Sequence, residues 1–342
     1  MNERWHPILQ QVSTTFTTRI LCNDPVSAAI GIAQTVFPAR RPNAVLLARP
    51  DSYPLALAAA RLLHRPFDAV LLYTEGEQLE ESVSRELIRL SPQGKGLPGQ
   101  VIVLGAMHAN VLHQLAELGF SAAHLIGHDQ WDTVGKIAAF EPLTGSGHAL
   151  LVSADPLGGG IAAGSFAAAT GAPVLFASER GLSDMAIRFL RSHPRQKLIV
   201  AAPESYLPPT LGSEVRKLGS KIEAWIGGRD GYETSVELAK LRKGKVKFGF
   251  GRKEQSGRGL ALVPADQWAF GAAAAALSNR GREIPLLLTR QDRLPAAVGE
   301  FLLELQGRSG GVRPHGFVVG SYEVISQPVQ ILLHRALARD GS

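Results

Sequence analysis

The sequence predicts an α/β protein of three similar subdomains with mostly parallel sheets, and three observations support this prediction. One pattern of apolar strand, polar turn and Ala-rich helix occurs three times in the 342 residues. Its strands are uninterrupted apolar runs, as a sheet covered by helices on both faces requires. The chain is also longer than the roughly 250 to 300 residues that one hydrophobic core normally serves.

The first unit of each repeat is a strand that runs into an aspartate turn and then an Ala-rich helix. The turn aspartates are Asp51, Asp155 and Asp266. The three copies read AVLLARPDSYPLALAAARLL, ALLVSADPLGGGIAAGSFAAA and LALVPADQWAFGAAAAAL. Self-similarity of this kind marks a repeat architecture, so the segments predict one structural unit present in three copies.

Two further strand-and-helix units follow in each repeat. The second unit reads AVLLYTEGEQLEESVSRELIRL, APVLFASERGLSDMAIRFLRS and IPLLLTRQDRLPAAVGEFLLEL. The third reads QVIVLGAMHANVLHQLAELG, KLIVAAPESYLPPTLGSEVRKLG and HGFVVGSYEVISQPVQILLHRAL. Strands that alternate with helices in this way predict parallel pairing.

The fourth unit is a helix entered through a turn that contains an aspartate. It reads IGHDQWDTVGKIA and IGGRDGYETSVELAK, with a poorer counterpart in ILCNDPVSAAIGIAQ. Asp230 with Glu233 forms a capping box, and Asp129 with Asp132 forms a weaker one. Helix capping is therefore an alternative to ligand binding for these aspartates.

The units also predict domain boundaries. We expect a loose N-terminal arm at residues 1–18 and three repeats at residues 19–121, 122–221 and 222–342. Each repeat, at about 100 residues, is large enough to hold a small core of its own.

The ordered set of motifs resembles the cell wall-binding repeat 2 family, whose members carry three tandem copies of about this length. The family's G-x-D-R-Y-x-T turn is matched by Gly228–Thr234 and Gly127–Thr133, and the first copy keeps Asp24. The family's A-S-x-x-x-F-P-D-A-L segment corresponds to Ala48–Leu57, in which Tyr53 and the proline after it match the aromatic-proline pair.

Two motif positions of that family differ in every copy of this chain. The family's acid is replaced by Leu55, Gly159 and Phe270, and its arginine is replaced by Pro25, Gln130 and Gly231. The resemblance implies three Rossmann-like or toprim-like subdomains around a pseudo-threefold axis. It also implies non-catalytic attachment to an anionic cell-wall polysaccharide or related polymer.

Candidate ligand-binding residues follow from the position of the loops. Ligands of open parallel sheets bind beyond the carboxyl ends of the strands, and an aromatic ring beside a carboxylate suits sugar recognition. The candidates are Asp51, Tyr53, Asp129, Asp155, Asp230, Tyr232, Asp266 and Trp268. The alternative is structural, with each aspartate in its own turn and each aromatic side chain between repeats.

The net charge of +6 favours acidic partners, and much of it is local. One segment from Lys240 to Lys253 has seven basic residues and no acid: Lys240, Arg242, Lys243, Lys245, Lys247, Arg252 and Lys253. It predicts a polyanion-binding patch for a teichoic-type polymer, with nucleic acid as the less favoured partner. The alternative is a solvated strand and loop whose Phe248 and Phe250 are buried.

The sequence gives no sign of an enzyme, a cofactor or a metal site. Its one cysteine, Cys22, cannot form an internal disulfide, and no standard catalytic motif is present. The turn from Asp155 to Gly164 is rich in glycine but lacks the G-x-G-x-x-G spacing, and His124 and His128 lack a third ligand. The alternative hypothesis is a cytosolic binder or enzyme for a small phosphorylated or nucleotide-like ligand.

The N-terminal residues have charges where a signal peptide needs an apolar run. The longest uncharged stretch, Pro156–Ser178, contains five glycines and two prolines, so it does not predict a membrane span. We therefore expect a cytoplasmic protein without membrane insertion, with the cell envelope of the resembled family as the alternative.

Overall fold

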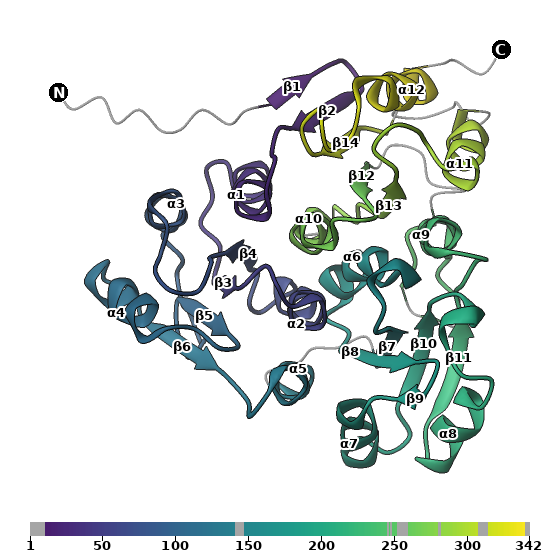
Figure 1. The fold of residues 1–342 in the computed structure, drawn as a ribbon, viewed down its shortest axis with the longest axis horizontal. Coiled ribbons are helices and arrows are strands. Elements are labelled where there is room, and N and C mark those ends of the chain that lie inside the picture. The colour runs from purple at the N-terminus through teal and green to yellow at the C-terminus, as the bar shows by residue number, and fades with distance from the viewer. Residues whose placement is uncertain are drawn as a thin grey trace.

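Three mostly parallel sheets, each flanked by helices, make up the fold in a computed structural model (Figure 1). The structure describes residues 11–140, 147–244, 246, 248–251, 259–279, 282–306 and 314–338. Strands and helices alternate along the chain, which confirms the predicted α/β class with Rossmann-like subdomains.

The first and second sheets have the same strand order. The first sheet contains β3 (Val45–Ala48), β4 (Val70–Tyr73), β5 (Val101–Leu104) and β6 (Ala122–Leu125), in the order β4-β3-β5-β6. The second contains β7 (His148–Ser153), β8 (Val174–Ser178), β10 (Lys197–Ala201) and β11 (Lys221–Trp225), in the order β8-β7-β10-β11. A short β9 (Gly181–Leu182) pairs antiparallel with the edge of the second sheet.

The third sheet repeats this order by taking its last strand from the other end of the chain. It contains β12 (Leu260–Pro264), β13 (Leu286–Thr289) and β14 (Gly316–Val319), in the order β13-β12-β14. Next to β14 lies β2 (Thr17–Ile20), followed by the antiparallel β1 (Gln11–Ser13). The strand order is therefore the same in all three sheets, which supports the predicted threefold repetition.

The position of β2 corrects the prediction of a loose arm at residues 1–18. Residues 11–13 and 17–20 are strands, and all four side chains of β2 are buried. Arg19 is also buried. Its guanidinium compensates for the loss of water by donating hydrogen bonds to the carbonyl oxygens of Gly320, Ser321 and Ile325, at 2.7 to 2.9 Å. The polar sequence of β2 hid a strand whose partners lie about 300 residues away in the chain. Residues 1–10 lie outside the described part.

The sheets also divide the chain differently from the predicted repeats. β6 belongs to the predicted second repeat but pairs with β5 of the first, with Val101 opposite Ala122. β11 pairs with β10 in the same way across the next predicted boundary. The fourth strand of the first sheet therefore comes from the predicted second repeat, and that of the second sheet comes from the boundary with the third.

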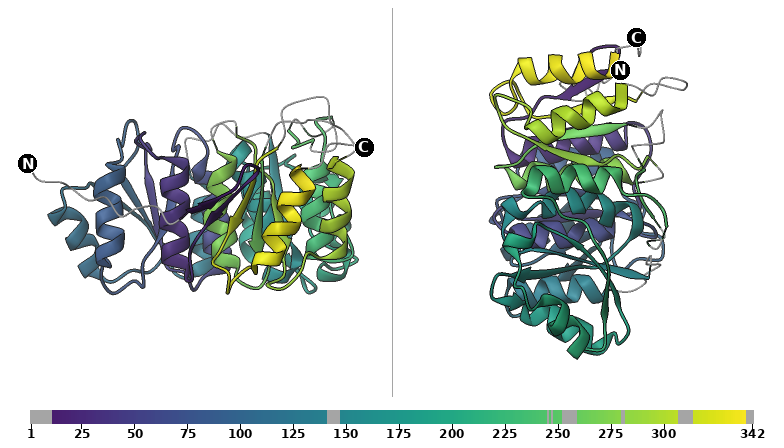
Figure 2. Two further views of the ribbon diagram at one scale, coloured as in Figure 1. Left: turned by 90° about the horizontal axis from the view of Figure 1, so that it is seen from above. Right: turned by 90° about the vertical axis from the view of Figure 1, so that its right-hand side faces the viewer.

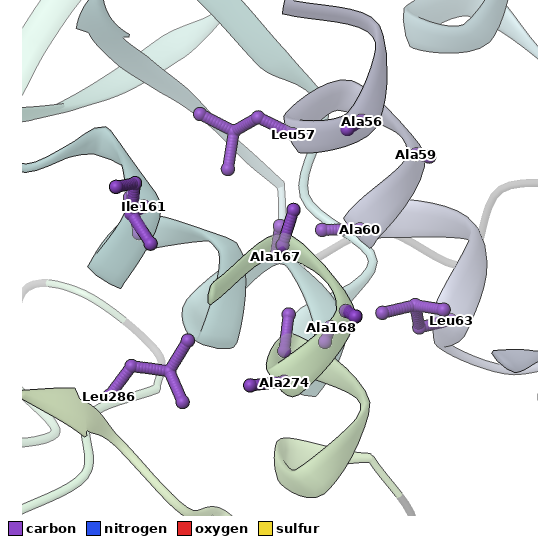
Figure 3. Close-up of a cluster of buried hydrophobic side chains, with 14 of the residues drawn as sticks. Ala56, Leu57, Ala59, Ala60, Leu63, Ile161, Ala167, Ala168, Ala274 and Leu286 are labelled. Carbon is purple, nitrogen blue, oxygen red and sulfur yellow. The ribbon is translucent and has the colours of Figure 1, made fainter. Parts of the chain in front are cut away.

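Three helices rich in small residues meet at the centre of the molecule (Figures 1 and 3). They are α2 (Tyr53–Ala59), α6 (Gly160–Thr170) and α10 (Trp268–Ala274), and short 3-10 turns extend α2 and α10 through residues 60–63 and 275–278. Ala60, Ala167 and Ala274 are buried in this cluster. A side chain on Gly271 would overlap Ile161, so the close approach of these helices requires glycine there.

The remaining helices connect or flank the sheets and stand side by side along the molecule (Figure 2). The helices that follow the fourth strands are α1 (Pro25–Val36), α5 (Gln130–Ala139) and α9 (Gly231–Lys240). The others are α3 (Glu81–Leu90), α4 (Ala109–Glu117), α7 (Asp184–Ser192), α8 (Leu211–Lys217), α11 (Ala296–Gln306) and α12 (Gln327–Ala338). Within the described ranges, no helix combines the length and the apolar character needed to cross a bilayer.

Candidate functional site at the carboxyl ends of the strands

Each sheet brings together two aspartate turns that the sequence places in different repeats. One turn follows the first strand of the sheet, and the other follows its fourth strand. The pairs are Asp51 with Asp129, Asp155 with Asp230, and Asp266 with Asp24. Because parallel strands end at the same edge of a sheet, the loops of such a pair converge there.

In the first sheet the two loops enclose a cavity of about 440 Å³. This pocket is lined by residues 49, 51, 52, 55, 104–106, 126–130 and 133. These residues come from the loops after β3, β5 and β6 and from the first turns of α2 and α5. Pockets that hold small molecules measure roughly 300 to 1,000 Å³, so this one is large enough for a ligand.

One wall of the pocket is an ion pair on the loop after β3. The Nε and Nη2 groups of Arg49 donate to one oxygen of the Asp51 carboxylate, Oδ2, at 3.0 and 2.5 Å. Both side chains are substantially exposed. Ser52, next in the chain, donates from its hydroxyl to the Gln130 side-chain oxygen at 3.1 Å, which links the two walls.

The opposite wall is the capped N-terminus of α5. The Asp129 carboxylate accepts a hydrogen bond from the Asp132 amide at 2.7 Å, so the predicted cap is present. The Asp132 carboxylate accepts from the His128 amide at 3.0 Å, and this hydrogen bond lowers the pKa of Asp132. A Cβ on Gly127 would lie 2.5 Å from the Asp132 carboxylate, which explains the glycine before the turn.

The floor of the pocket is apolar. Leu55 and Leu104 are buried beneath it, and Ile126 is 42% exposed at its side. The pocket therefore combines an apolar surface with carboxylate, amide, hydroxyl and imidazole groups, as sites for hydroxyl-bearing ligands do.

The aromatic candidates of the first and third repeats lie between the sheets. Tyr53 is 5% exposed, and its ring meets those of Trp268 and Phe176 edge-to-face, with centroids 5.9 and 6.2 Å apart. Burial raises the pKa of the Tyr53 hydroxyl, which lies 3.4 Å from the Ser153 carbonyl oxygen. Trp268 is half-buried. This arrangement corresponds to the structural alternative, because Tyr53 has no face open for sugar stacking.

In the second sheet the two aspartate turns contact each other closely. Asp155 accepts from the Leu157 amide at 2.8 Å, and Asp230 accepts from the Glu233 amide at 2.9 Å. A Cβ on Gly231, which follows Asp230, would overlap the carbonyl oxygen of Leu157, so the two turns pack against each other. The pKa of Tyr206 is raised by burial and then by the negative charges of Asp155 and Asp230.

The glycines after Asp155 serve this close packing. A Cβ on Gly158 would lie 2.5 Å from that of Ser153, and a Cβ on Gly160 would overlap the Tyr53 hydroxyl. Gly159 has a φ of +83°, a conformation that favours glycine. Protein atoms thus occupy the space around these glycines.

In the first and second sheets, the two motif positions that differ from the resembled family are neighbours. Leu55 and Gln130 line the same pocket, and Gly159 touches Gly231. Phe270 lies on α10 and Pro25 on α1, two helices that pack together. Sequence reasoning missed this pairing because the two positions of each pair fall in successive repeats.

Asp266 and Tyr232 do not line the pocket of the first sheet. Asp266 is exposed on the loop after β12. Tyr232 is half-buried, and the Arg290 guanidinium lies 5.3 Å from the centre of its ring. Of the histidines weighed as ligands, His128 lines the pocket and His124 bonds the Gly105 carbonyl oxygen at 2.8 Å. Among the described residues, no group of three potential metal ligands is found.

The basic segment is partly described. Lys240 forms an ion pair with Glu304 at 3.2 Å, while Arg242 and Lys243 are exposed. Lys245, Lys247, Arg252 and Lys253 lie outside the described residues. Phe250 is buried and Phe248 half-buried, and both pack edge-to-face on Phe166, which agrees with the structural alternative for these rings.

Comparison with known proteins adds information on the fold. No family model matches the chain, and no curated protein matches it. The solved structures similar to this chain include Cwp6 and Cwp8 from Clostridium difficile, each with a TM-score of 0.72, 16% sequence identity and 95% of this chain covered. The aligned region is 48% of the Cwp6 chain and 52% of the Cwp8 chain, so this chain spans about half their length. At this identity the likeness shows that the chain shares the fold of these two proteins.

Proposed function

We propose that this chain is a non-catalytic module that binds a cell-wall polysaccharide, as a divergent relative of the cell wall-binding repeat 2 family. The observation that carries the proposal is the pocket of the first sheet, built from two converging aspartate turns. Two further facts support it: the sequence motifs of that family, and the fold shared with the cell wall proteins Cwp6 and Cwp8.

The polar groups of the pocket suit binding because their neighbours hold them in place. Asp129 is fixed as the cap of α5, Asp51 is fixed by Arg49, and Gln130 is held by Ser52. Groups that are fixed before a ligand arrives lose little conformational entropy when it binds. A sugar unit with several hydroxyls can satisfy such a set of acceptors and donors.

The anionic groups of the polymer are assigned to the basic segment. Arg242 and Lys243 are exposed, and the segment has seven basic residues and no acid. Attraction between exposed charges weakens as salt is added, so retention of the polymer should depend on ionic strength.

The alternative, a cytosolic binder or enzyme for a small phosphorylated or nucleotide-like ligand, rested in part on the glycine-rich turn after Asp155. Close packing accounts for the glycines of that turn. We therefore favour the polymer and, in place of the cytoplasmic location expected from the sequence, the alternative location at the cell envelope. Fractionation of cells into cytosol and envelope tests that location.

The proposal is tested by co-sedimentation with purified Gram-positive cell walls, before and after chemical removal of their phosphate-linked polymers. We expect the protein to sediment with intact walls, and to be released both by salt and by removal of the polymers. A variant with glutamine at Arg242, Lys243, Lys245 and Lys247 should be retained several-fold less.

The matched control places glutamine at Arg188, Arg191, Arg216 and Lys217, which are exposed on α7 and α8. It makes the same change in net charge and should sediment like the natural protein. Failure to sediment with intact walls at low salt would contradict the proposal.

A further inference from the structure

The charge of the pocket at the carboxyl ends of the first sheet is opposite in sign to that of the whole protein. One arginine and two aspartates line the pocket, which gives it a formal charge of −1 with His128 neutral. The chain as a whole carries +6. The excess of basic residues that would attract an anionic polymer therefore lies outside the pocket.

The only positive charge on the pocket lining is already neutralised within the part of the chain that the structure describes. Arg49 directs two of its nitrogens at a single oxygen of Asp51. Arg49 also packs against Gly76, where an added Cβ would lie 2.9 Å from its Cδ, and Gly76 stands between the exposed Glu75 and Glu77. A ligand that carries a phosphate or carboxylate would thus meet an arginine that already pairs with Asp51 and lies against a segment with two acids.

The carboxylates, by contrast, keep acceptor capacity. Asp51 bonds Arg49 through Oδ2, and Asp129 caps α5 through Oδ1. A carboxylate has about four lone-pair positions on two oxygens, so each group can still accept from ligand hydroxyls or an ammonium group. Nearby, Asp132 lies 3.6 Å from the Lys136 ammonium, and this pair adds no net charge.

From these observations we infer that the pocket binds an uncharged or amine-bearing sugar unit and rejects its phosphate- or carboxylate-bearing counterpart. The inference rests on the proposed function and refines it. The sugar units of the polymer are read in the pocket through hydroxyl or amine contacts, and the anionic groups are bound elsewhere on the protein. The apolar floor of Leu55 and Leu104 faces the carbon skeleton of the sugar.

The test uses matched pairs of ligands with the full chain. Hexoses, N-acetylhexosamines and hexosamines are titrated at low salt by saturation-transfer NMR, each alongside its own 6-phosphate. We expect at least one unphosphorylated sugar to bind, and its 6-phosphate to bind about tenfold more weakly because of like-charge repulsion.

A charge variant of the pocket sharpens this test. Asp51→Asn together with Asp129→Asn changes the formal charge of the pocket from −1 to +1. Asparagine caps helices about as well as aspartate, so α5 should keep its start. In this variant the order should reverse, with the 6-phosphate binding more tightly. Asp292→Asn, an exposed change on the loop after β13, should keep the natural preference.

Three results would overturn the inference: tighter binding of 6-phosphates by the natural protein, an unchanged preference in the double variant, or binding of none of the unphosphorylated sugars. Each can occur while the protein still sediments with cell walls, in which case only the inference about the pocket fails. Sugar selectivity without sedimentation would instead remove the polymer proposal.

Discussion

Gly159 and Gly231 are in direct contact: a Cβ on Gly231 would lie 3.0 Å from the Gly159 amide nitrogen and would overlap the Leu157 carbonyl oxygen. The contact brings the first turn of α9 onto the loop after β7. The resembled family has an acid at the position of Gly159 and an arginine at the position of Gly231. Here neither position has room for a side chain, so glycine at one position is compatible only with a residue as small as glycine at the other.

We expect Gly231→Ala to lower the free energy of unfolding by about 1 to 3 kcal/mol, because the added methyl group meets backbone atoms that cannot move aside cheaply. Urea denaturation measures the change. Gly299→Ala is the control, since α11 has open space at this residue. That substitution should leave stability unchanged or raise it by up to about 1 kcal/mol. Equal effects of the two substitutions would contradict the assigned contact.

The central helices should be the most sensitive part of the core. Leu57→Ala removes a fully buried side chain between α2 and α6, and we expect a loss of about 2 to 5 kcal/mol because a cavity remains. Leu303 on α11 is 59% exposed, so Leu303→Ala should change the free energy of unfolding by less than about 0.5 kcal/mol. The prediction fails if thermal or urea unfolding shows a similar small effect for both variants.

Arg19 should be essential for the attachment of β2. Burial lowers the pKa of Arg19, and the side chain is retained by donating to carbonyl oxygens and to the Gln330 side chain at 2.8 Å. Arg19→Met would leave these buried acceptors unpaired, so we expect a loss of at least about 2 kcal/mol. Arg188→Met, on the exposed face of α7, is the matched control. Hydrogen exchange of β14 amides should rise in the first variant only.

An ionic cluster at the amino ends of the second sheet predicts a dependence of stability on pH. The His148 side chain lies 2.5 Å from the Glu223 carboxylate, and the Lys197 ammonium lies 3.3 Å from it. The hydrogen bond from His148, aided by Lys197, lowers the pKa of Glu223 from 4.5 to about 2.

Because the folded state holds Glu223 in its charged form, this contribution is complete above pH 4.5 and is lost as the pH falls toward 2. In the Glu223→Gln variant, the urea concentration at the unfolding midpoint should therefore fall less steeply between pH 4.5 and about 2. Glu237→Gln, on an exposed residue of α9, should leave the decline as it is in the natural protein. Parallel curves for all three proteins would rule out the role given to Glu223.

Much of the fold could be predicted because its signals are local. The apolar runs from Val45 to Ala48 and from Leu286 to Thr289 are buried strands, and Asp129 and Asp230 cap helices as their spacing indicates. These features depend on neighbouring residues only. The threefold repetition was visible because such local signals recur in the same order.

The features that could not be predicted depend on residues far apart in the chain. The strand Thr17–Ile20 has a polar sequence, and only its partner β14 makes it a buried strand. Tyr53 follows the exposed Asp51 by two residues in the sequence, yet Trp268 and Phe176 cover its ring. The pocket likewise joins loops that are separated by about 80 residues, as the bond between Ser52 and Gln130 shows.

The pairing of β2 with β14 has a consequence for biosynthesis. About 300 residues separate β2 from β14 in the chain, so β2 has no partner strand until the ribosome has synthesised those residues. The first and second sheets can assemble during that interval, since their strands are consecutive in the chain. Completion of the third sheet thus comes after that of the first two, and it joins segments about 300 residues apart in one structure.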